Sequence, residues 1–198
     1  HDKLPTANFL RQTEIALWIM LGTCCRIGEL AKARWEDVHI DEGYWLIPPE
    51  NSKNGKGHTV FLSTFTQEQF QKLQPISLTT GWCLPSREGN SHINPKSITK
   101  QIKDRTRITP LANRSRAAGT LLLSGGAWTP HDLRRTSATL MGELGVMGEV
   151  IERCLNHVEQ NRLKRIYQRH ELKAEQQEAW RLLGERLNLI IENENNVV

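Results

Sequence analysis

The spacing of apolar residues constrains the fold of this chain more than any other feature, because it departs from the helical period in only one region. A helical pattern recurs in eight segments, which are residues 8–23, 26–34, 64–73, 96–107, 129–145, 148–155, 162–168 and 171–191. Residues 38–62 differ, because short runs rich in β-branched and aromatic residues alternate there with turn sequences. The pattern predicts an α+β, mostly α-helical fold with one small three-stranded antiparallel sheet.

The predicted sheet is a meander whose two corners carry turn-forming residues. Its strands are residues 38–40, 44–47 and 58–62. Gly43 lies in the first turn and Gly55 in the second. After the sheet, Thr66 and Gln69 are spaced as a capping box, and Pro130 suits the first turn of a later helix.

The length of 198 residues is that of one domain, so we expect a single domain over residues 1–198. The first residue is His1 rather than Met, which suggests a fragment of a longer protein. The longest apolar stretches are too short to span a bilayer, and no secretion signal is recognisable. The four cysteines form no C-x-x-C pair and two are adjacent, which predicts reduced thiols in a cytoplasmic protein, without a zinc site or disulfides.

Positive charge is concentrated in one part of the chain. The net charge is only +4, from 26 basic and 22 acidic residues. Between residues 96 and 135, however, two acidic residues stand against nine basic ones, namely Lys96, Lys100, Lys103, Arg105, Arg107, Arg114, Arg116, Arg134 and Arg135. Such a concentration favours binding to a phosphate backbone, with a solvated surface as the alternative.

His131 and Arg134 lie three residues apart at a predicted helix start. Their side chains therefore share one helix face and can bind the same group of atoms. Unpaired amide groups and the helix dipole favour an anion at that position, which makes a phosphate site. The alternative is an ordinary first-turn ion pair with Asp132.

Two further cations lie in the first third of the chain. Arg26 precedes Glu29 by three residues, so Glu29 either orients the guanidinium toward a phosphate or simply pairs with it at the surface. Lys53 lies at the tip of the second predicted hairpin, from which an ammonium can reach DNA, and Lys56 competes for the same role.

His157 and Tyr167 follow ten residues apart near the C-terminus. Tyr167 is one of only two tyrosines, and it lies in a strongly basic segment that contains Arg162, Lys164, Arg165 and Arg169. That setting should favour the phenolate over the phenol. A packing tyrosine on an amphipathic helix is the alternative.

In order and spacing, the set Arg26, Lys53, His131, Arg134, His157 and Tyr167 resembles the complete active-site set of the tyrosine recombinases, or phage integrase family. The flanking sequences agree, with Arg-Ile-Gly-Glu-Leu at residues 26–30, His-Asp-Leu-Arg-Arg-Thr at 131–136 and Leu-Asn-His at 155–157. The hairpin from Lys53 most resembles the integrases of genomic islands and satellite phages. One departure is the longer segment 105–127.

The resemblance implies the catalytic-domain fold of that family and a DNA strand-cutting and rejoining activity. Tyr167 would attack a phosphodiester to give a 3′-phosphotyrosine and a free 5′-hydroxyl. Arg26 and Arg134 would bind the non-bridging oxygens, and His157 would donate a further hydrogen bond.

The remaining roles implied by the resemblance concern protons and partners. His131 would be the base and Lys53 the acid for the leaving 5′-oxygen. Neither metal nor any other cofactor is implied. The partner would be double-stranded DNA attachment sites, bound by a tetramer that exchanges C-terminal segments. Further DNA contacts are expected from other basic residues, namely Lys56, Lys96, Lys100, Lys103, Arg135, Arg162, Lys164 and Arg165.

Three alternatives stay open from the sequence. A type IB topoisomerase uses the same chemistry as a monomer. A DNA-binding regulator would keep the fold without catalysis, but it would have no need of Tyr167 or His131. An RNA-processing nuclease would use paired histidines and would leave Tyr167 unexplained. The apolar residues of segment 180–191 are suited either to a neighbouring subunit or to the chain's own core.

Overall fold

The computed structural model describes residues 3–110, 117–158 and 172–195. Helices dominate these ranges. The α-helices are α1 (Arg11–Thr23), α2 (Ile27–Ala31), α3 (Thr64–Ser77), α4 (Pro95–Arg105), α5 (Pro130–Glu143), α6 (Gly148–Cys154) and α8 (Lys173–Asn195). Short 3-10 turns connect them, namely η1 (Pro5–Ala7), η2 (Trp35–Asp37), η3 (Pro49–Asn51) and η4 (Leu78–Thr80). The predicted helix 162–168 lies outside the described residues.

The sheet has three antiparallel strands in the order β1-β2-β3, which confirms the predicted fold class. The strands are β1 (Val38–His39), β2 (Tyr44–Ile47) and β3 (His58–Phe61). Trp45 pairs with Val38 on one side and with Val60 on the other. All three of these side chains are buried, so the meander presents one apolar face to the core.

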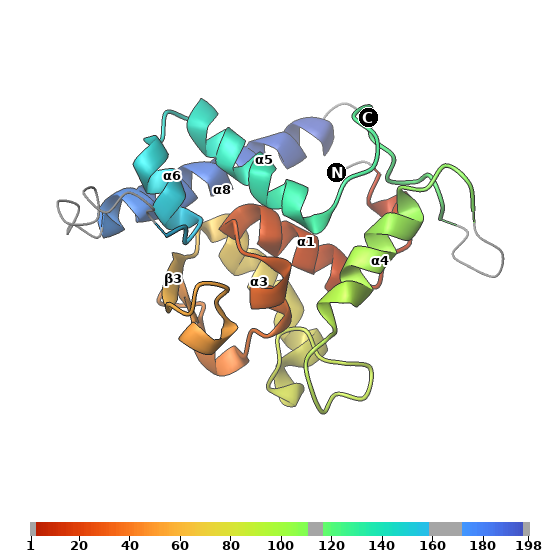
Figure 1. Cartoon of the computed structure of the whole chain (residues 1–198), viewed down its shortest axis with the longest axis horizontal. Coiled ribbons are helices and arrows are strands. Elements are labelled where there is room, and N and C mark those ends of the chain that lie inside the picture. Colours follow the sequence, from red (N-terminus) through yellow and green to blue (C-terminus); the bar gives the residue numbers. More distant parts are fainter. Residues whose placement is uncertain (1–2, 111–116, 159–171, 196–198) are drawn as a thin grey trace.

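Helix α1 forms the centre of the molecule. It packs against α3 on one side and against α5 and α8 on the other (Figure 1). Its apolar residues cover most of its circumference, and Ile15, Ile19 and Met20 are at most 1% exposed. The sequence predicts this buried helix for that reason, although α1 begins at Arg11 rather than at residue 8.

The N-terminal cap of α3 differs from the prediction. Ser63, not Thr66, is the capping residue, and its hydroxyl accepts a hydrogen bond from the main-chain N–H of Thr66 at 3.4 Å. The capping box of Thr66 and Gln69 is therefore wrong, because the helix begins earlier than that box requires. Helix α3 also continues to Ser77, past the predicted end at residue 73.

Helix α8 packs on the chain's own core. Trp180, Leu183 and Leu187 are at most 2% exposed, and the indole N–H of Trp180 donates to the carbonyl of Thr23 at 3.2 Å. A Cβ at Gly184 would lie 2.3 Å from the Ser63 hydroxyl oxygen, so only glycine permits this approach. Within the described residues, the central part of the tail is thus buried against its own domain.

Candidate functional site

Arg134 is a buried residue that connects three helices by hydrogen bonds. It extends from α5 and is 3% exposed. Its Nη1 donates to the carbonyl of Cys24 at the end of α1, and its Nη2 donates to the carbonyl of Leu155 at the end of α6. Burial lowers the pKa of Arg134, and the neighbouring charge of Arg26 lowers it further. A guanidinium has five N–H donors, so Arg134 keeps capacity to bind an anion.

Arg26 is held in place by Glu29 at the start of α2. The carboxylate of Glu29 accepts from the main-chain N–H of Arg26 at 2.7 Å and from its Nη1 at 2.8 Å. The Glu29 side chain is 3% exposed, whereas that of Arg26 is 22% exposed. A glutamate at the third helical position reaches back to the preceding residue in this way. The ion pair considered from the sequence is present, and it orients the guanidinium beside Arg134.

His58 joins the same cluster, although the sequence did not predict it there. It is the first residue of β3, and its Nε2 lies 3.3 Å from the carbonyl oxygen of Cys154. Burial lowers the pKa of His58, and the charges of Arg134 and Arg26 act in the same direction. With His58 neutral, two guanidinium groups and the single carboxylate of Glu29 leave a surplus of one positive charge, which favours a bound anion.

The segment Leu155–His157 passes along this cluster and is held at each residue. The carbonyl of Leu155 accepts from Arg134, and the side chain of Asn156 bonds to the hairpin between β2 and β3. The Nδ1 of His157 lies 2.7 Å from the Glu152 carboxylate. Because a carboxylate only accepts, Nδ1 carries the proton, and Nε2 is the nitrogen left for a ligand.

The hairpin tip carries both candidate lysines at the surface. Lys53 follows the buried Ser52, and a turn closes from the N–H of Gly55 to the carbonyl of Ser52 at 3.2 Å. Gly55 has φ +69°, a left-handed conformation that glycine adopts without strain. Lys53 and Lys56 are both exposed, and neither ammonium has a hydrogen bond to the part of the chain that the structure describes.

His131 lies in the exposed first turn of α5, one turn before Arg134. Its neighbour Asp132 accepts from the N–H and hydroxyl of Thr129 at 2.9 and 2.8 Å, and these bonds lower the pKa of that carboxyl. The ion pair of Asp132 forms with Arg135, at 3.3 Å, rather than with His131. His131 has no hydrogen bond to a described residue and is open to a ligand.

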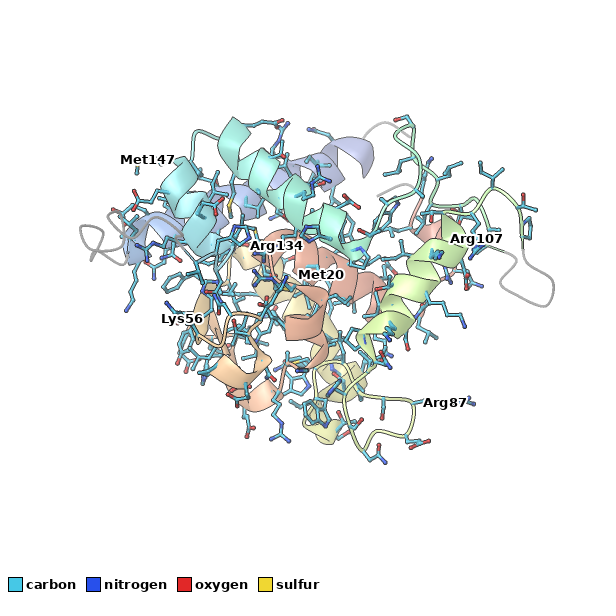
Figure 2. The ribbon with its side chains drawn as sticks, viewed as in Figure 1. Met20, Lys56, Arg87, Arg107, Arg134 and Met147 are labelled. Carbon is cyan, nitrogen blue, oxygen red and sulfur yellow. The ribbon has the colours of Figure 1, made fainter. Side chains whose placement is uncertain are left out.

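The predicted basic segment divides into buried and exposed cations. Lys96, Lys100 and Lys103 are exposed at helical spacing on α4, and Arg134 lies between Lys56 and the end of α4 in the view of Figure 2. Arg105 is different: it is 6% exposed and donates to the main-chain carbonyls of Ala7 and Asn8. Arg105 therefore does not belong to the DNA-binding surface that the charge run suggested.

Several predicted residues lie outside the described part of the chain. They are Arg114, Arg116, Arg162, Lys164, Arg165, Tyr167 and Arg169. Within the described ranges, no group of three or more His, Cys, Asp or Glu side chains is arranged to hold a metal ion. The helices in those ranges are too short or too polar to cross a membrane.

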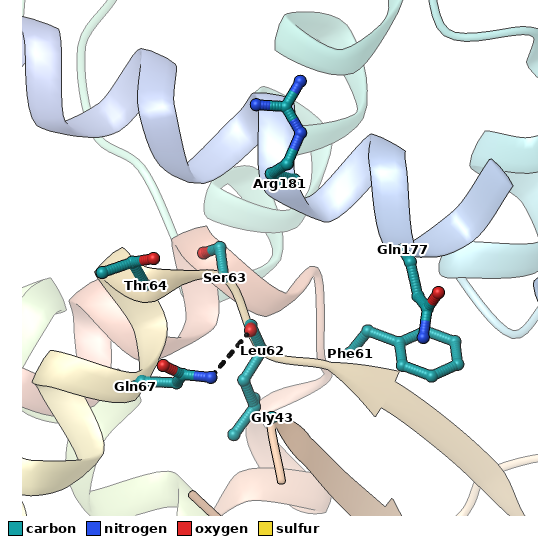
Figure 3. A pocket seen from close by; sticks show the side chains of 8 residues that line it. All are labelled: Gly43, Phe61, Leu62, Ser63, Thr64, Gln67, Gln177 and Arg181. Carbon is teal, nitrogen blue, oxygen red and sulfur yellow. Dashed lines mark hydrogen bonds between the residues drawn. The ribbon is translucent and has the colours of Figure 1, made fainter. Parts of the chain in front are cut away.

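A separate pocket lies between the end of β3, the start of α3 and α8 (Figure 3). Gln67 donates to the carbonyl of Leu62 at 3.4 Å on one wall, and Arg181 projects from α8 on another. Arg181 pairs with Glu178 and Glu185. The lining includes none of the residues that the sequence assigned to DNA.

The architecture is that of the catalytic domain of a tyrosine recombinase. The chain belongs to the phage integrase family, since the model of that family matches residues 6–174. Prophage integrase IntA of Escherichia coli (strain K12) is 29% identical over 176 residues, which cover 85% of this chain and 38% of that protein. The chain thus spans well under half the length of this relative.

Solved structures show the same fold. The integrase from mycobacterium phage Brujita matches 91% of this chain and 55% of its own, with a TM-score of 0.65 and 16% identity. XerA recombinase matches 85% of this chain and 60% of its own, with a TM-score of 0.61 and 17% identity. The catalytic core of lambda integrase matches 76% of this chain and 82% of its own, with a TM-score of 0.55 and 21% identity.

The sequence did not predict His58, Asn54, Glu152 or Asn156 as parts of the site. The signal for His58 and Asn54 was their place on the same hairpin as Lys53. Asn156 and Glu152 come into contact with their partners only through the turn at the end of α6, which no local spacing reveals.

Proposed function

We propose that this chain is a site-specific DNA recombinase that cleaves and rejoins DNA strands through a covalent 3′-phosphotyrosine. The observation that carries the proposal is the pair formed by the buried Arg134 and the partly buried Arg26. Arg26 is the strongest charged neighbour of Arg134, and the pair keeps a surplus positive charge and unused N–H donors beside the Leu155–His157 segment. Two like charges are placed together at a cost in stability, and a phosphate offsets that cost.

Tyr167 is the proposed nucleophile. Its oxygen attacks the phosphorus in line, forming a bond to the 3′-phosphate as the bond to the 5′-oxygen breaks. Arg26 and Arg134 bind the non-bridging oxygens, where charge increases in the transition state. His157, as an imidazolium with a proton on each ring nitrogen, donates a hydrogen bond to the same oxygens through Nε2 while its Nδ1–H binds Glu152.

Two proton transfers complete the proposed step. The phenol of tyrosine has a reference pKa of about 10, so a base is needed at neutral pH, and the exposed His131 takes that proton. Lys53 gives a proton to the departing 5′-oxygen. The phosphotyrosine conserves the energy of the cleaved bond, so a 5′-hydroxyl from a partner strand reverses the reaction without nucleotide or metal.

The proposed partner is a double-stranded DNA attachment site, in a mobile element integrated or excised in the bacterial cytoplasm at the nucleoid. The exposed face of α4, with Lys56, Arg135 and the basic segment around Tyr167, would contact the backbone. A lambda integrase has been solved as a tetramer on a Holliday junction. We propose a tetramer here as well, with the C-terminal end of α8, where Leu189 is 50% exposed, as the segment offered to a neighbour.

A suicide DNA duplex, nicked so that the 5′-hydroxyl strand diffuses away after cleavage, tests the proposal. The wild-type chain should become covalently attached to the 3′ end in the presence of EDTA, and Tyr167→Phe should not. Tyr44→Phe is the matched control, because Tyr44 is the second tyrosine and stacks on His39 at 4.4 Å on the sheet. A covalent adduct that persists in Tyr167→Phe would refute the mechanism.

The choice between the two hairpin lysines needs a second substrate. A bridging sulfur in place of the 5′-oxygen leaves as a thiolate and needs no acid, because thiols have a pKa of about 8.5. If Lys53 is the acid, Lys53→Ala should cleave the oxygen substrate slowly and the sulfur substrate at the wild-type rate. A rescue seen with Lys56→Ala instead would assign the proton to Lys56.

A further inference from the structure

The hairpin that carries Lys53 is fastened to the segment that carries His157 by a closed ring of side-chain hydrogen bonds. Asn54 Nδ2 donates to Asn156 Oδ1 at 3.0 Å, and Asn156 Nδ2 donates to the Ser52 hydroxyl at 3.0 Å. That hydroxyl donates in turn to Asn54 Oδ1 at 2.8 Å. The ring joins residues that are 102 and 104 positions apart in the sequence.

Main-chain groups fix the direction of every bond in this ring. Asn54 Oδ1 also accepts from the main-chain N–H of Lys56 at 3.0 Å, and Asn54 Nδ2 also donates to the main-chain carbonyl of Asn156 at 2.9 Å. An N–H can only donate and a carbonyl can only accept, so the Asn54 amide has a single possible orientation. Bonds arranged in such a ring strengthen one another.

Asn156 has two separable roles. Its backbone has φ +47°, which allows the chain to turn after α6, and glycine or asparagine adopts this conformation most readily. Glycine would satisfy the backbone alone. The asparagine side chain adds the contact to Ser52 and Asn54, which the turn itself does not require.

The neighbours of the ring are the groups to which chemistry is assigned above. Lys53 lies between two of its members, and His157 follows the third. The residue before Asn156 is Leu155, whose carbonyl binds Arg134. An exposed hairpin tip without such an anchor would hold Lys53 over many positions, and misplacement by about 1 Å costs up to about 10²-fold in rate.

We propose that Asn54 and Asn156 are positioning residues that hold the Lys53 hairpin against the His157 segment, so that the acid and the phosphate-binding groups act as one unit. This inference rests on the proposed function, in which Lys53 protonates the leaving oxygen. Neither asparagine touches the DNA in this role. Each acts through the placement of Lys53.

The experiment compares Asn156→Gly and Asn54→Ala with the wild-type chain in single-turnover cleavage of two suicide duplexes, one with the 5′-oxygen and one with a bridging 5′-sulfur. Asn156→Gly keeps the left-handed turn while removing the side chain. Both variants should cleave the oxygen substrate more slowly, by about 10- to 10²-fold, and the sulfur substrate at nearly the wild-type rate. Asn156→Gly combined with Lys53→Ala should be no slower than Lys53→Ala alone.

Asn90→Ala is the matched control, since Asn90 is an exposed asparagine that binds Ser86 at 3.3 Å in the loop before α4. It should leave both rates unchanged. Equal slowing of both substrates by Asn156→Gly, or no slowing of either, would overturn the inference. Failure of the wild-type chain to form an adduct with either substrate would instead overturn the proposed function, so the two failures are distinguishable.

Discussion

Arg105 and Arg134 make an instructive pair, because the sequence places both in one basic segment and the fold buries both. Each is at most 6% exposed and donates to main-chain carbonyls. Arg105 binds the carbonyls of Ala7 and Asn8 at the end of η1, and Arg134 binds those of Cys24 and Leu155. By burial and hydrogen bonding alone, the two arginines look alike.

Their electrostatic surroundings differ. The Arg105 guanidinium lies 4.2 Å from the centre of the Phe9 ring, and the charge that acts on its pKa is the carboxylate of Asp104. Arg134 instead has the guanidinium of Arg26 as its strongest charged neighbour. A buried cation beside an anion and an aromatic face is a finished structural contact. Arg134 lies beside a second cation, and the single carboxylate of Glu29 leaves a surplus positive charge, which is why we propose Arg134 as the phosphate-binding arginine.

Arg134→Gln should have the largest effect of the tests that separate the two. The amide of glutamine can still donate to one of the two carbonyls, but the charge for the phosphate is lost. We expect adduct formation on the suicide duplex to slow by on the order of 10²- to 10³-fold or more, measured per folded molecule. Arg87→Gln, an equal charge change in an exposed loop, serves as the control. An Arg134→Gln rate close to that of the control would mean that Arg134, like Arg105, has only a structural role.

Arg105→Met should produce the opposite result, a loss of stability without a loss of chemistry. The substitution leaves the carbonyls of Ala7 and Asn8 without their guanidinium donor. An unsatisfied buried polar group costs about 1–3 kcal/mol, so we expect the free energy of unfolding in urea to fall by about 2–4 kcal/mol. The cleavage rate of the folded fraction should not change. A folded Arg105→Met protein that fails to cleave would show that the site extends to α4.

Arg105 and Arg134 also differ in how well the sequence predicts their roles. Period and turn residues were sufficient for the sheet and for most helices, because these depend on local spacing. The contact between Arg26 and Glu29 was equally predictable, since a separation of three residues at a helix start brings the two side chains together. Arg105 was misread as a surface cation, because its partners lie 97 and 98 residues away at the end of η1.

The ends of some elements were misplaced for a related reason. Helix α3 begins at the cap provided by Ser63, and α8 can approach that cap closely because residue 184 is glycine. The sequence pattern alone favoured Thr66. The ring of Asn54, Asn156 and Ser52 was equally invisible, because it depends on how the hairpin and the end of α6 meet. Distant contacts of this kind are set by the packing of whole elements.

Sulfate should report the difference between the two arginines without any DNA. An anion bound between Arg26 and Arg134 stabilises the fold by about 1.4 kcal/mol at ten times its dissociation constant. We expect sulfate to raise the unfolding temperature of the wild-type chain and of Arg105→Met by equal amounts. Sodium chloride at matched ionic strength is the reference.

Sulfate also stabilises proteins generally, so the informative quantity is the difference between variants at one sulfate concentration. Arg26→Gln should lose the specific part of the increase. An unchanged response in Arg26→Gln would mean that the arginine pair is not an anion site, whatever its role in packing.

The smallest effect is expected from an exposed member of the same basic segment, Lys100 on α4. Lys100→Gln removes a surface charge and no buried contact, so its stability should stay within about 0.5 kcal/mol of the wild-type value. Its affinity for DNA should fall, with the slope of log affinity against log salt reduced by about 0.9. Lys72→Gln is the control, since Lys72 is exposed on α3 and lies 3.8 Å from Glu68. If both lysine variants change the salt slope equally, the α4 face is not a preferred DNA surface. The burial of a basic residue would then not distinguish the cations that bind the DNA backbone from those that stabilise the fold.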